Sequence, residues 1–272
     1  MKPLRGARRG STLALVLWTL VVAGGLSLAV STRTRSAIAV ASNARAQVVA
    51  RYAAESGITL AVHAIEDSLA AVTDSVSRNA LLNALTRQPF PLRVREIGEA
   101  RMELALEDVN AKLDLNYADV DAVSQLLAEF GDAGTARRSA AAIRAHIGTG
   151  VTPDSPDESI SNARTARATA WGAGARYLSG LDDLMAIADV DQEIVARAAP
   201  YLTVDGDGMT NRVTAPAPVL RAAQGALVDA PNRLLLVSRG WLATSSLTHE
   251  IQAVYAVQGN DLALVRWRER TR

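Results

Sequence analysis

An uncharged apolar run near the amino terminus constrains the fold of this chain most. Residues 11–30 (STLALVLWTLVVAGGLSLAV) contain no charged side chain. A helix that rises ~1.5 Å per residue needs about this length to cross a hydrocarbon layer of ~30 Å. The run therefore predicts a single membrane-spanning helix, with the rest of the chain folded outside the membrane.

The charges around this run are unevenly distributed. Every formal charge before Glu55 is positive, namely Lys2, Arg5, Arg8, Arg9, Arg33, Arg35, Arg45 and Arg51. Four of them precede the run, which favours an amino terminus in the cytoplasm and an exported remainder, although Arg33 and Arg35 on the far side oppose this orientation. The whole chain carries a net charge of only +1, so no overall field attracts it to nucleic acid.

Composition limits the chemistry that the chain can perform. With 49% hydrophobic and 21% charged residues, 272 residues can bury one good core or two small ones. The absence of cysteine excludes disulfides, thiolate zinc sites and cysteine nucleophiles. The three histidines lie far apart in sequence, and no phosphate-binding glycine loop or nucleophile elbow is present. We therefore expect no enzymatic activity and no catalytic residue.

Three kinds of processing are compatible with the apolar run. A secretory signal peptide would be cleaved after it, and the small residues at 27–29 suit such a site. A twin-arginine signal at Arg8 and Arg9 is weaker, because polar residues follow where apolar ones are needed. In the third possibility the chain is cleaved before the run, between Gly10 and Ser11.

The helical pattern continues beyond the apolar run. Within residues 45–72, apolar or small residues recur at spacings of three and four, which predicts a helix with one packed face. These residues are Val49, Tyr52, Ala53, Gly57, Leu60, Ala61, Ala64 and Leu69. His63 has Glu66 and Asp67 three and four residues further on, and we interpret this group as a local ion pair in preference to a metal site.

A change of period at residue 100 predicts strands. Alternation at Met102, Leu104 and Leu106 resumes in the opposite phase at Val109 after Glu107-Asp108, which predicts a β-hairpin. Towards the carboxyl terminus, residues 233–238, 249–257 and 262–267 predict three further strands. Asn211 is expected to end a short strand before a helix that starts at residues 215–218.

The middle of the chain predicts two helix pairs. Residues 120–130 and 135–146 form the first pair, and residues 181–188 and 192–202 form the second, with a Gly/Pro-rich loop between the pairs. Such pairs resemble helix-hairpin-helix units, which bind DNA in many proteins. Arg137 and Arg138 follow the first turn and keep this alternative open, whereas two aspartates in the second turn, 189–191, would repel phosphate.

Several of these features together resemble a known family. The basic leader ends in Gly10 before Ser11 and an apolar helix, as in type IV pilins and pseudopilins, where prepilin peptidase cuts after the glycine. Most relatives carry glutamate at the fifth mature position, but this chain has Leu15, which is typical of the tip subunit, and an unpaired carboxylate at membrane depth would cost ~3 kcal/mol. With Leu115-Asn116 and the element around Asn211, the chain is similar to the minor pseudopilin K (GspK) family of type II secretion systems.

This resemblance implies an α+β, pilin-like fold, in which a long N-terminal helix packs on a small antiparallel sheet and an all-α, helix-hairpin-helix or SAM-like domain is inserted. The implied divisions are a leader (1–10), a transmembrane and assembly helix (11–30), a helical stalk (31–98), a first hairpin (99–116), the inserted helical domain (117–204) and a C-terminal β part (205–272). Leu13, Leu15 and Leu17 would lie on the assembly helix. The implied location is the bacterial inner membrane, with a single span and a periplasmic C-terminal domain.

The resemblance also implies partners and a role. The partners would be the I and J minor pseudopilins, the major pseudopilin and prepilin peptidase. The role would be that of a tip subunit in the pseudopilus, which assists assembly and protein export across the outer membrane. Two alternatives remain: a membrane-anchored helix-hairpin-helix protein for DNA binding or uptake, and a minor pilin of a type IV pilus.

Some members of the family bind calcium, which directs attention to two acidic loops. The loop at 205–208 (DGDG) begins like an EF-hand, but Met209 and Pro216 occupy ligand positions. Asp154, Asp157 and Glu158 lie in a Gly/Pro-rich loop that is expected to be a solvated acidic loop. We therefore assign no cofactor and no metal ligand, and calcium stays a possibility without a place in the sequence.

Overall fold

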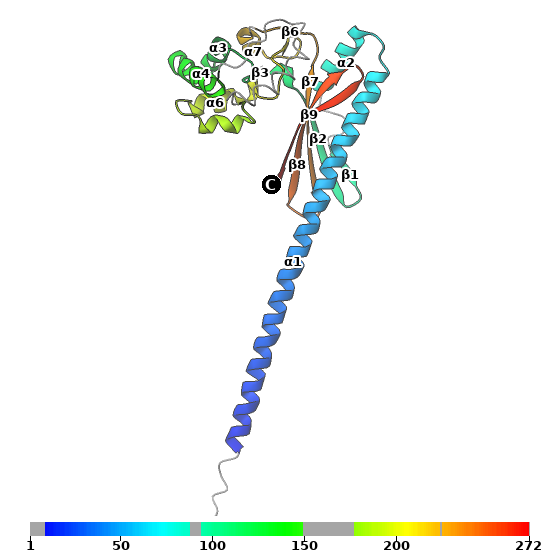
Figure 1. Ribbon diagram of the computed structural model, residues 1–272. Coiled ribbons are helices and arrows are strands. Elements are labelled where there is room, and N and C mark those ends of the chain that lie inside the picture. Colours follow the sequence, from blue (N-terminus) through cyan, green and yellow to red (C-terminus); the bar gives the residue numbers. More distant parts are fainter. Residues whose placement is uncertain (1–8, 88–93, 149–176, 224, 272) are drawn as a thin grey trace, which may run out of the picture.

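One long helix dominates the protein. The computed structural model describes residues 9–87, 94–148, 177–223 and 225–271. Helix α1 (Arg9–Ala70) runs without interruption for 62 residues, and its first half stands clear of the folded body (Figure 1). At ~1.5 Å per residue its length is about 93 Å, so one helix combines the apolar run with a face of the folded domain.

A five-stranded antiparallel sheet packs against the second half of α1. The strands are β1 (Val94–Ile97), β2 (Ala100–Asp108), β7 (Arg233–Leu242), β8 (Thr248–Gln258) and β9 (Asp261–Thr271), in the order β1-β2-β7-β8-β9. Buried and exposed residues alternate along β2 and β7, as expected for a sheet with one covered face. The core between helix and sheet contains Ala54, Ile58, Ala61, Ile65, Leu69, Met102, Leu104, Leu234, Leu236, Ile251 and Ala253.

A separate helical unit lies beside the sheet (Figure 1). It contains α3 (Val120–Ala128), α4 (Ala133–Ile147), the 3-10 helix η2 (Leu181–Ala186), α6 (Gln192–Ala198), the 3-10 helix η3 (Ala199–Tyr201) and α7 (Ala217–Ala222). Two parallel strand pairs border it, β3 (Leu113–Asp114) with β4 (Leu202–Thr203) and β5 (Thr210–Asn211) with β6 (Leu227–Val228). The unit has its own apolar core, distinct from that of the sheet.

The expected α+β, pilin-like architecture is confirmed. A long N-terminal helix packs on an antiparallel sheet, and helices far apart in sequence gather in a second body between β3 and β7. Helix α2 (Ser75–Arg87) follows α1 and contributes Leu82 to the core of the sheet.

The hairpin predicted across Glu107-Asp108 is wrong. Strand β2 continues to Asp108 and pairs with β7, while the hairpin turn lies at Gly98, between β1 and β2, where φ is +60°. Asp108 ends the strand as the cap of the 3-10 helix η1 (Val109–Ala111), accepting the backbone N–H of Asn110. The second phase of alternation therefore reflects a capped turn and the short β3, which pairs with β4.

The predicted packed face of α1 is partly wrong. Ala53, Gly57 and Ala61 are buried as expected, but Tyr52, Leu60 and Ala64 are exposed. The buried stripe consists of Ala46, Ala50, Ala53, Ala54, Gly57, Ile58, Ala61, Ile65 and Leu69. Only small residues fit where the backbone of Gly240 approaches the helix, whereas Ile58, Ile65 and Leu69 pack further along it. Tyr52 and Leu60 lie outside this stripe. Helix α1 ends at Ala70, two residues before the end of the helical pattern predicted over 45–72.

Candidate functional site

The first half of α1 is an exposed apolar surface. Every side chain described between residues 13 and 45 is exposed, and Leu13, Leu15 and Leu17 expose 76%, 65% and 63% of their surface. Within the described residues, α1 is the one helix long and apolar enough to cross a membrane. An exposed apolar surface of this length needs lipid or other helices around it.

The predicted cleavage site lies at the start of this helix. Gly10 and Ser11 are the second and third residues of α1. Their position ahead of the apolar run agrees with the expected site of a prepilin cut, but no observation tests the cleavage, which stays a prediction. Leu15, the fifth residue after the predicted cut, lies in the first turns of the exposed surface.

The second half of α1 is held against the sheet by a close approach of two backbones. A Cβ atom on Gly240 of β7 would lie 2.5 Å from the backbone nitrogen of Ala54 and would also collide with the backbone oxygen of Ala50. Gly57 of α1 instead faces side chains of the sheet, those of Ser238 and Leu104. Small residues on both partners therefore fix the orientation of α1, including its exposed half, relative to the folded body.

A groove of about 380 Å³ runs between α1 and β9. Its walls include the apolar Ile58, Val62 and Tyr255, together with Trp267. His63 lines the groove, and its Nδ1 lies 3.7 Å from a carboxylate oxygen of Glu66, one of the two predicted partners. Glu55, Thr59 and His63 also line it, so the groove has both apolar and polar walls.

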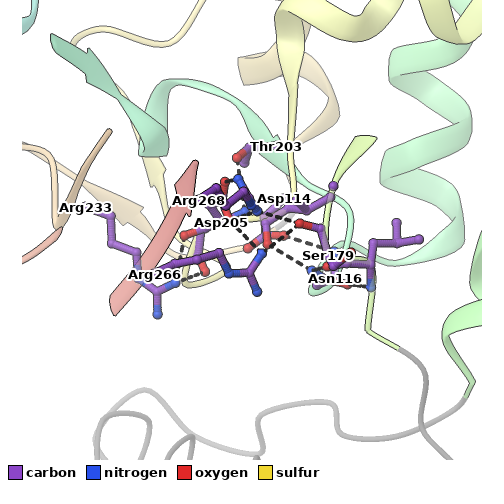
Figure 2. A network of polar contacts seen from close by, with 12 residues as sticks. Asp114, Asn116, Ser179, Thr203, Asp205, Arg233, Arg266 and Arg268 are labelled. Atoms are coloured by element: carbon purple, nitrogen blue, oxygen red, sulfur yellow. Dashed lines mark hydrogen bonds and ion pairs between the residues drawn. The ribbon is translucent and has the colours of Figure 1, made fainter. Parts of the chain in front are cut away.

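Arginine side chains on the sheet connect the sheet to the helical unit (Figure 2). Arg266 donates to Asp205 at 2.8 Å, and Arg268 donates to both carboxylate oxygens of Asp205 at 2.7 and 2.8 Å. Both arginines also reach the backbone oxygen of Ser179. Arg233 on β7 donates to the backbone oxygen of Asp205 at 2.7 Å. We call this set, with Asp114, the polar junction.

Asp114 is the unusual member of the polar junction. It is 5% exposed; one carboxylate oxygen accepts the backbone N–H of Asn116, and the other has no hydrogen-bond partner. Burial raises the pKa of Asp114 to about 7, and the nearby Asp207 and Asp205 add to the effect, against the lowering influence of the Asn116 bond and Arg233. A buried carboxyl with a free oxygen is therefore held where the two bodies meet.

The asparagines noted in the sequence have structural roles. Asn116 donates to the backbone oxygens of Leu178 and Val204 and accepts the N–H of Leu178, so it ties the two ends of the helical unit together. Asn211 is completely buried and donates to Asp108, as does Thr214. The element that contributed to the family resemblance is thus a buried polar hub, and burial raises the pKa of Asp108 despite these bonds.

The DNA-binding alternative gains no support from the helical unit. Phosphate binds at helix N-termini whose backbone N–H groups are free. Here Asp119, Asp132 and Asp191 cap α3, α4 and α6, accepting the N–H groups of Ala122, Thr135 and Ile194. Arg137 and Arg138 are exposed on α4, but negative carboxylates already occupy the adjacent N-terminus.

The acidic loops give no metal centre among the described residues, where no cluster of three suitable ligands occurs. Asp205 is bound by arginines, and Asp207 accepts from Asn110, Met209 and Asn232. Asp154, Asp157 and Glu158 lie outside the described residues.

These features define a pilin-like protein, with an apolar N-terminal helix half free and half packed on an antiparallel sheet. The fold is shared with a chain of the GspK–GspI–GspJ complex from the type 2 secretion system of enterotoxigenic Escherichia coli, with a TM-score of 0.51 over 81% of this chain and 98% of that chain, at 14% identity. The resemblance to a type II secretion pseudopilin is confirmed at the level of the fold. No protein-family model and no curated protein matches the sequence.

Sequence reasoning missed the polar junction. The strand predicted at 262–267 includes Arg266 but ends before Arg268, and the loop that begins at Asp205 resembled only an incomplete EF-hand. One signal in the sequence could have revealed it, because arginine recurs at every second position at 266, 268 and 270. Side chains two residues apart on a strand lie on the same face of a sheet, so these arginines were candidates to meet one acidic partner surface. Asp205, the partner of Arg266 and Arg268, lies 61 and 63 residues before them, at a separation that periodicity does not reveal.

Proposed function

We propose that this chain is a minor pseudopilin that occupies the tip of a type II secretion pseudopilus. The observation that carries the proposal is the fold shared with a chain of the GspK–GspI–GspJ complex, combined with an exposed apolar half of α1. Leu15 supports the tip position, because a tip subunit has no neighbour above it whose amine would need a glutamate. The protein would act by assembly, without catalysis.

In this proposal the chain is anchored in the inner membrane by residues 11–30, and its folded body is periplasmic. Its partners are the I and J minor pseudopilins and the major pseudopilin, which would pack along the exposed part of α1. The groove beside Ile58 and Trp267 lies further along α1 and offers a place for a neighbouring subunit. A minor pilin of a type IV pilus would use the same surface, so the set of partners distinguishes the two roles.

Processing by prepilin peptidase tests the proposal. Coexpression with the peptidase, followed by N-terminal sequencing, is expected to give a mature chain that begins at Ser11. Gly10→Val should block this cut and leave the precursor intact, whereas Gly6→Val, in the same leader, should be processed normally. A mature chain that begins near Val30 would contradict the proposal, since a signal peptidase would then have removed the assembly helix.

Partner choice is tested by co-purification. The processed chain, solubilised in detergent, is expected to retain I-type and J-type minor pseudopilins. Retention of type IV minor pilins alone would assign the chain to a pilus, and salt-sensitive retention of DNA that is lost in Arg137→Gln/Arg138→Gln would favour the DNA-binding role.

A further inference from the structure

Two arginines stand directly beyond the uncharged run of α1. No charge lies between Arg9 and Arg33, an interval that spans about 36 Å of helix. A hydrocarbon layer is ~30 Å thick. When one end of this interval is at one membrane surface, Arg33 and Arg35 therefore lie at the phosphate level of the other surface.

The folded body does not use these two arginines. Both side chains are exposed, and the first acidic residue along α1, Glu55, lies about 30 Å beyond Arg35. The next two arginines on the same helix behave differently, because Arg45 pairs with Glu99 at 2.6 Å and Arg51 pairs with Glu55 at 2.9 Å. Neither Arg33 nor Arg35 forms an ion pair with any residue that the structure describes.

The neighbouring hydroxyl groups are directed into the helix itself. Thr32 Oγ1 donates to the backbone oxygen of Ala29, and Thr34 Oγ1 donates to that of Val30, both at 2.9 Å. Thr19, inside the apolar run, makes the same kind of bond to Val16. Bonds of this type satisfy hydroxyl groups where water is scarce. The guanidinium groups are thus the strongest outward donors in this turn of the helix.

The two arginines point to nearly opposite sides of α1. Residues two apart on an α-helix are separated by about 200° around its axis. A protein partner packed along one side would contact one arginine and leave the other outside the interface. A layer of headgroups surrounds the helix on every side and offers phosphate to both.

We infer that Arg33 and Arg35 bind phosphate groups of phospholipid headgroups in the leaflet where α1 leaves the membrane. Guanidinium matches phosphate with paired hydrogen bonds, and the long side chains allow the heads to reach the phosphate level. The contacts set the depth of α1, and they must break when the subunit is drawn from the membrane into a fibre. This inference rests on the proposed function only in that α1 spans a membrane.

Solid-state NMR tests these contacts directly. The full chain, with 13C at arginine Cζ, is reconstituted into phosphatidylcholine and phosphatidylglycerol vesicles in a buffer free of phosphate, and dephasing of the Cζ signal by lipid 31P is measured. Arg33→Gln and Arg35→Gln are each expected to remove a similar share of the dephased signal, and the double variant should remove both shares. Arg45→Gln is the matched control, and its loss of signal should be confined to the part that 31P does not dephase.

The outcomes separate the contacts from the membrane span. Flotation of every variant with vesicles reports whether the chain is membrane-bound, and failure of the wild type to float would overturn the span itself. Flotation with unchanged dephasing in the double variant would overturn the arginine contacts alone. A loss from only one of the two arginines would also overturn them, because it would indicate a one-sided protein contact.

Discussion

The two cores of this protein differ in how closely backbones approach. Between α1 and the sheet, the backbones nearly touch where Gly240 faces Ala50 and Ala54, and large side chains fill the rest of that core. The helical unit is filled by large residues such as Leu126 together with alanines. The first core therefore contains a region that admits no added side chain, whereas the helical unit depends on large residues, so added and removed volume should damage different parts of the protein.

Added volume at Gly240 should have the largest effect. Gly240→Val places side-chain atoms against the backbone of α1 at Ala50 and Ala54, and neither backbone can move without separating helix and sheet. We expect a loss of about 3 kcal/mol or more in the free energy of unfolding. Denaturant unfolding of the full chain in detergent, followed by tryptophan fluorescence, measures it. Gly24→Val is the control, since nothing lies within 4 Å of a Cβ at Gly24; equal stability of the two variants would refute the close approach.

Removed volume at Leu126 should damage the helical unit instead. Leu126 is completely buried on α3, and Leu126→Ala should cost about 3 kcal/mol by leaving a cavity. Hydrogen exchange is expected to accelerate in α3, α4 and α6 and to stay slow in β7 and β8. Met185→Ala, at a residue that is 75% exposed, should change neither region. Equal acceleration in the sheet would mean that the two cores unfold as one.

Loss of charge at Asp205 should weaken the connection between the two cores. Asp205→Asn keeps the size of the side chain but removes the negative charge that Arg266 and Arg268 share. Because both arginines are largely covered, we expect a loss of about 2 kcal/mol, less than for a fully buried pair. Hydrogen exchange at 203–208 should rise before exchange in either core. Asp182→Asn is the control, since the Asp182 carboxylate is exposed and its pairing with Arg270 is 3.3 Å long.

The sequence predicted the architecture better than the contacts. The uncharged run predicted one spanning helix, and the alternating residues of β7, β8 and β9 predicted their strands, because each signal lies within a single element. The capped turn at Asp108 was missed, since a 3-10 helix followed by a short strand imitates alternation. The buried face of α1 was predicted in part, because hydrophobicity alone favours Tyr52 over Ala50, whereas the sheet requires the smaller residue.

The candidate site was predictable where it is local. The apolar surface around Leu13, Leu15 and Leu17 follows from composition alone. The polar junction was not predictable, because Asp114, Asp205 and Arg268 belong to three segments that meet only in the folded protein. Cleavage at Gly10-Ser11 stays a prediction that depends on a peptidase.

The smallest expected effect concerns Asp114, and it is a gain of stability. The pKa of Asp114 is raised from 3.8 to about 7 by burial, so the folded protein keeps a proton that the unfolded chain releases between pH 4 and 7. The contribution of this group to stability is therefore fully present below pH 4 and is lost as the pH rises towards 7, the reverse of a salt-bridged aspartate.

Asp114→Asn tests this pH dependence, because it retains an oxygen for the N–H of Asn116 and removes the ionisation. At pH 8 this substitution should raise the free energy of unfolding by about 1 kcal/mol, which is less than the full raised pKa of Asp114 would imply. Thermal unfolding of wild type and variant at pH 4, 6 and 8 should show two curves that meet at pH 4 and separate above it. Curves that stay parallel would show that the Asp114 carboxylate is stabilised by contacts of the polar junction in the folded protein, and that the two cores tolerate a charge between them.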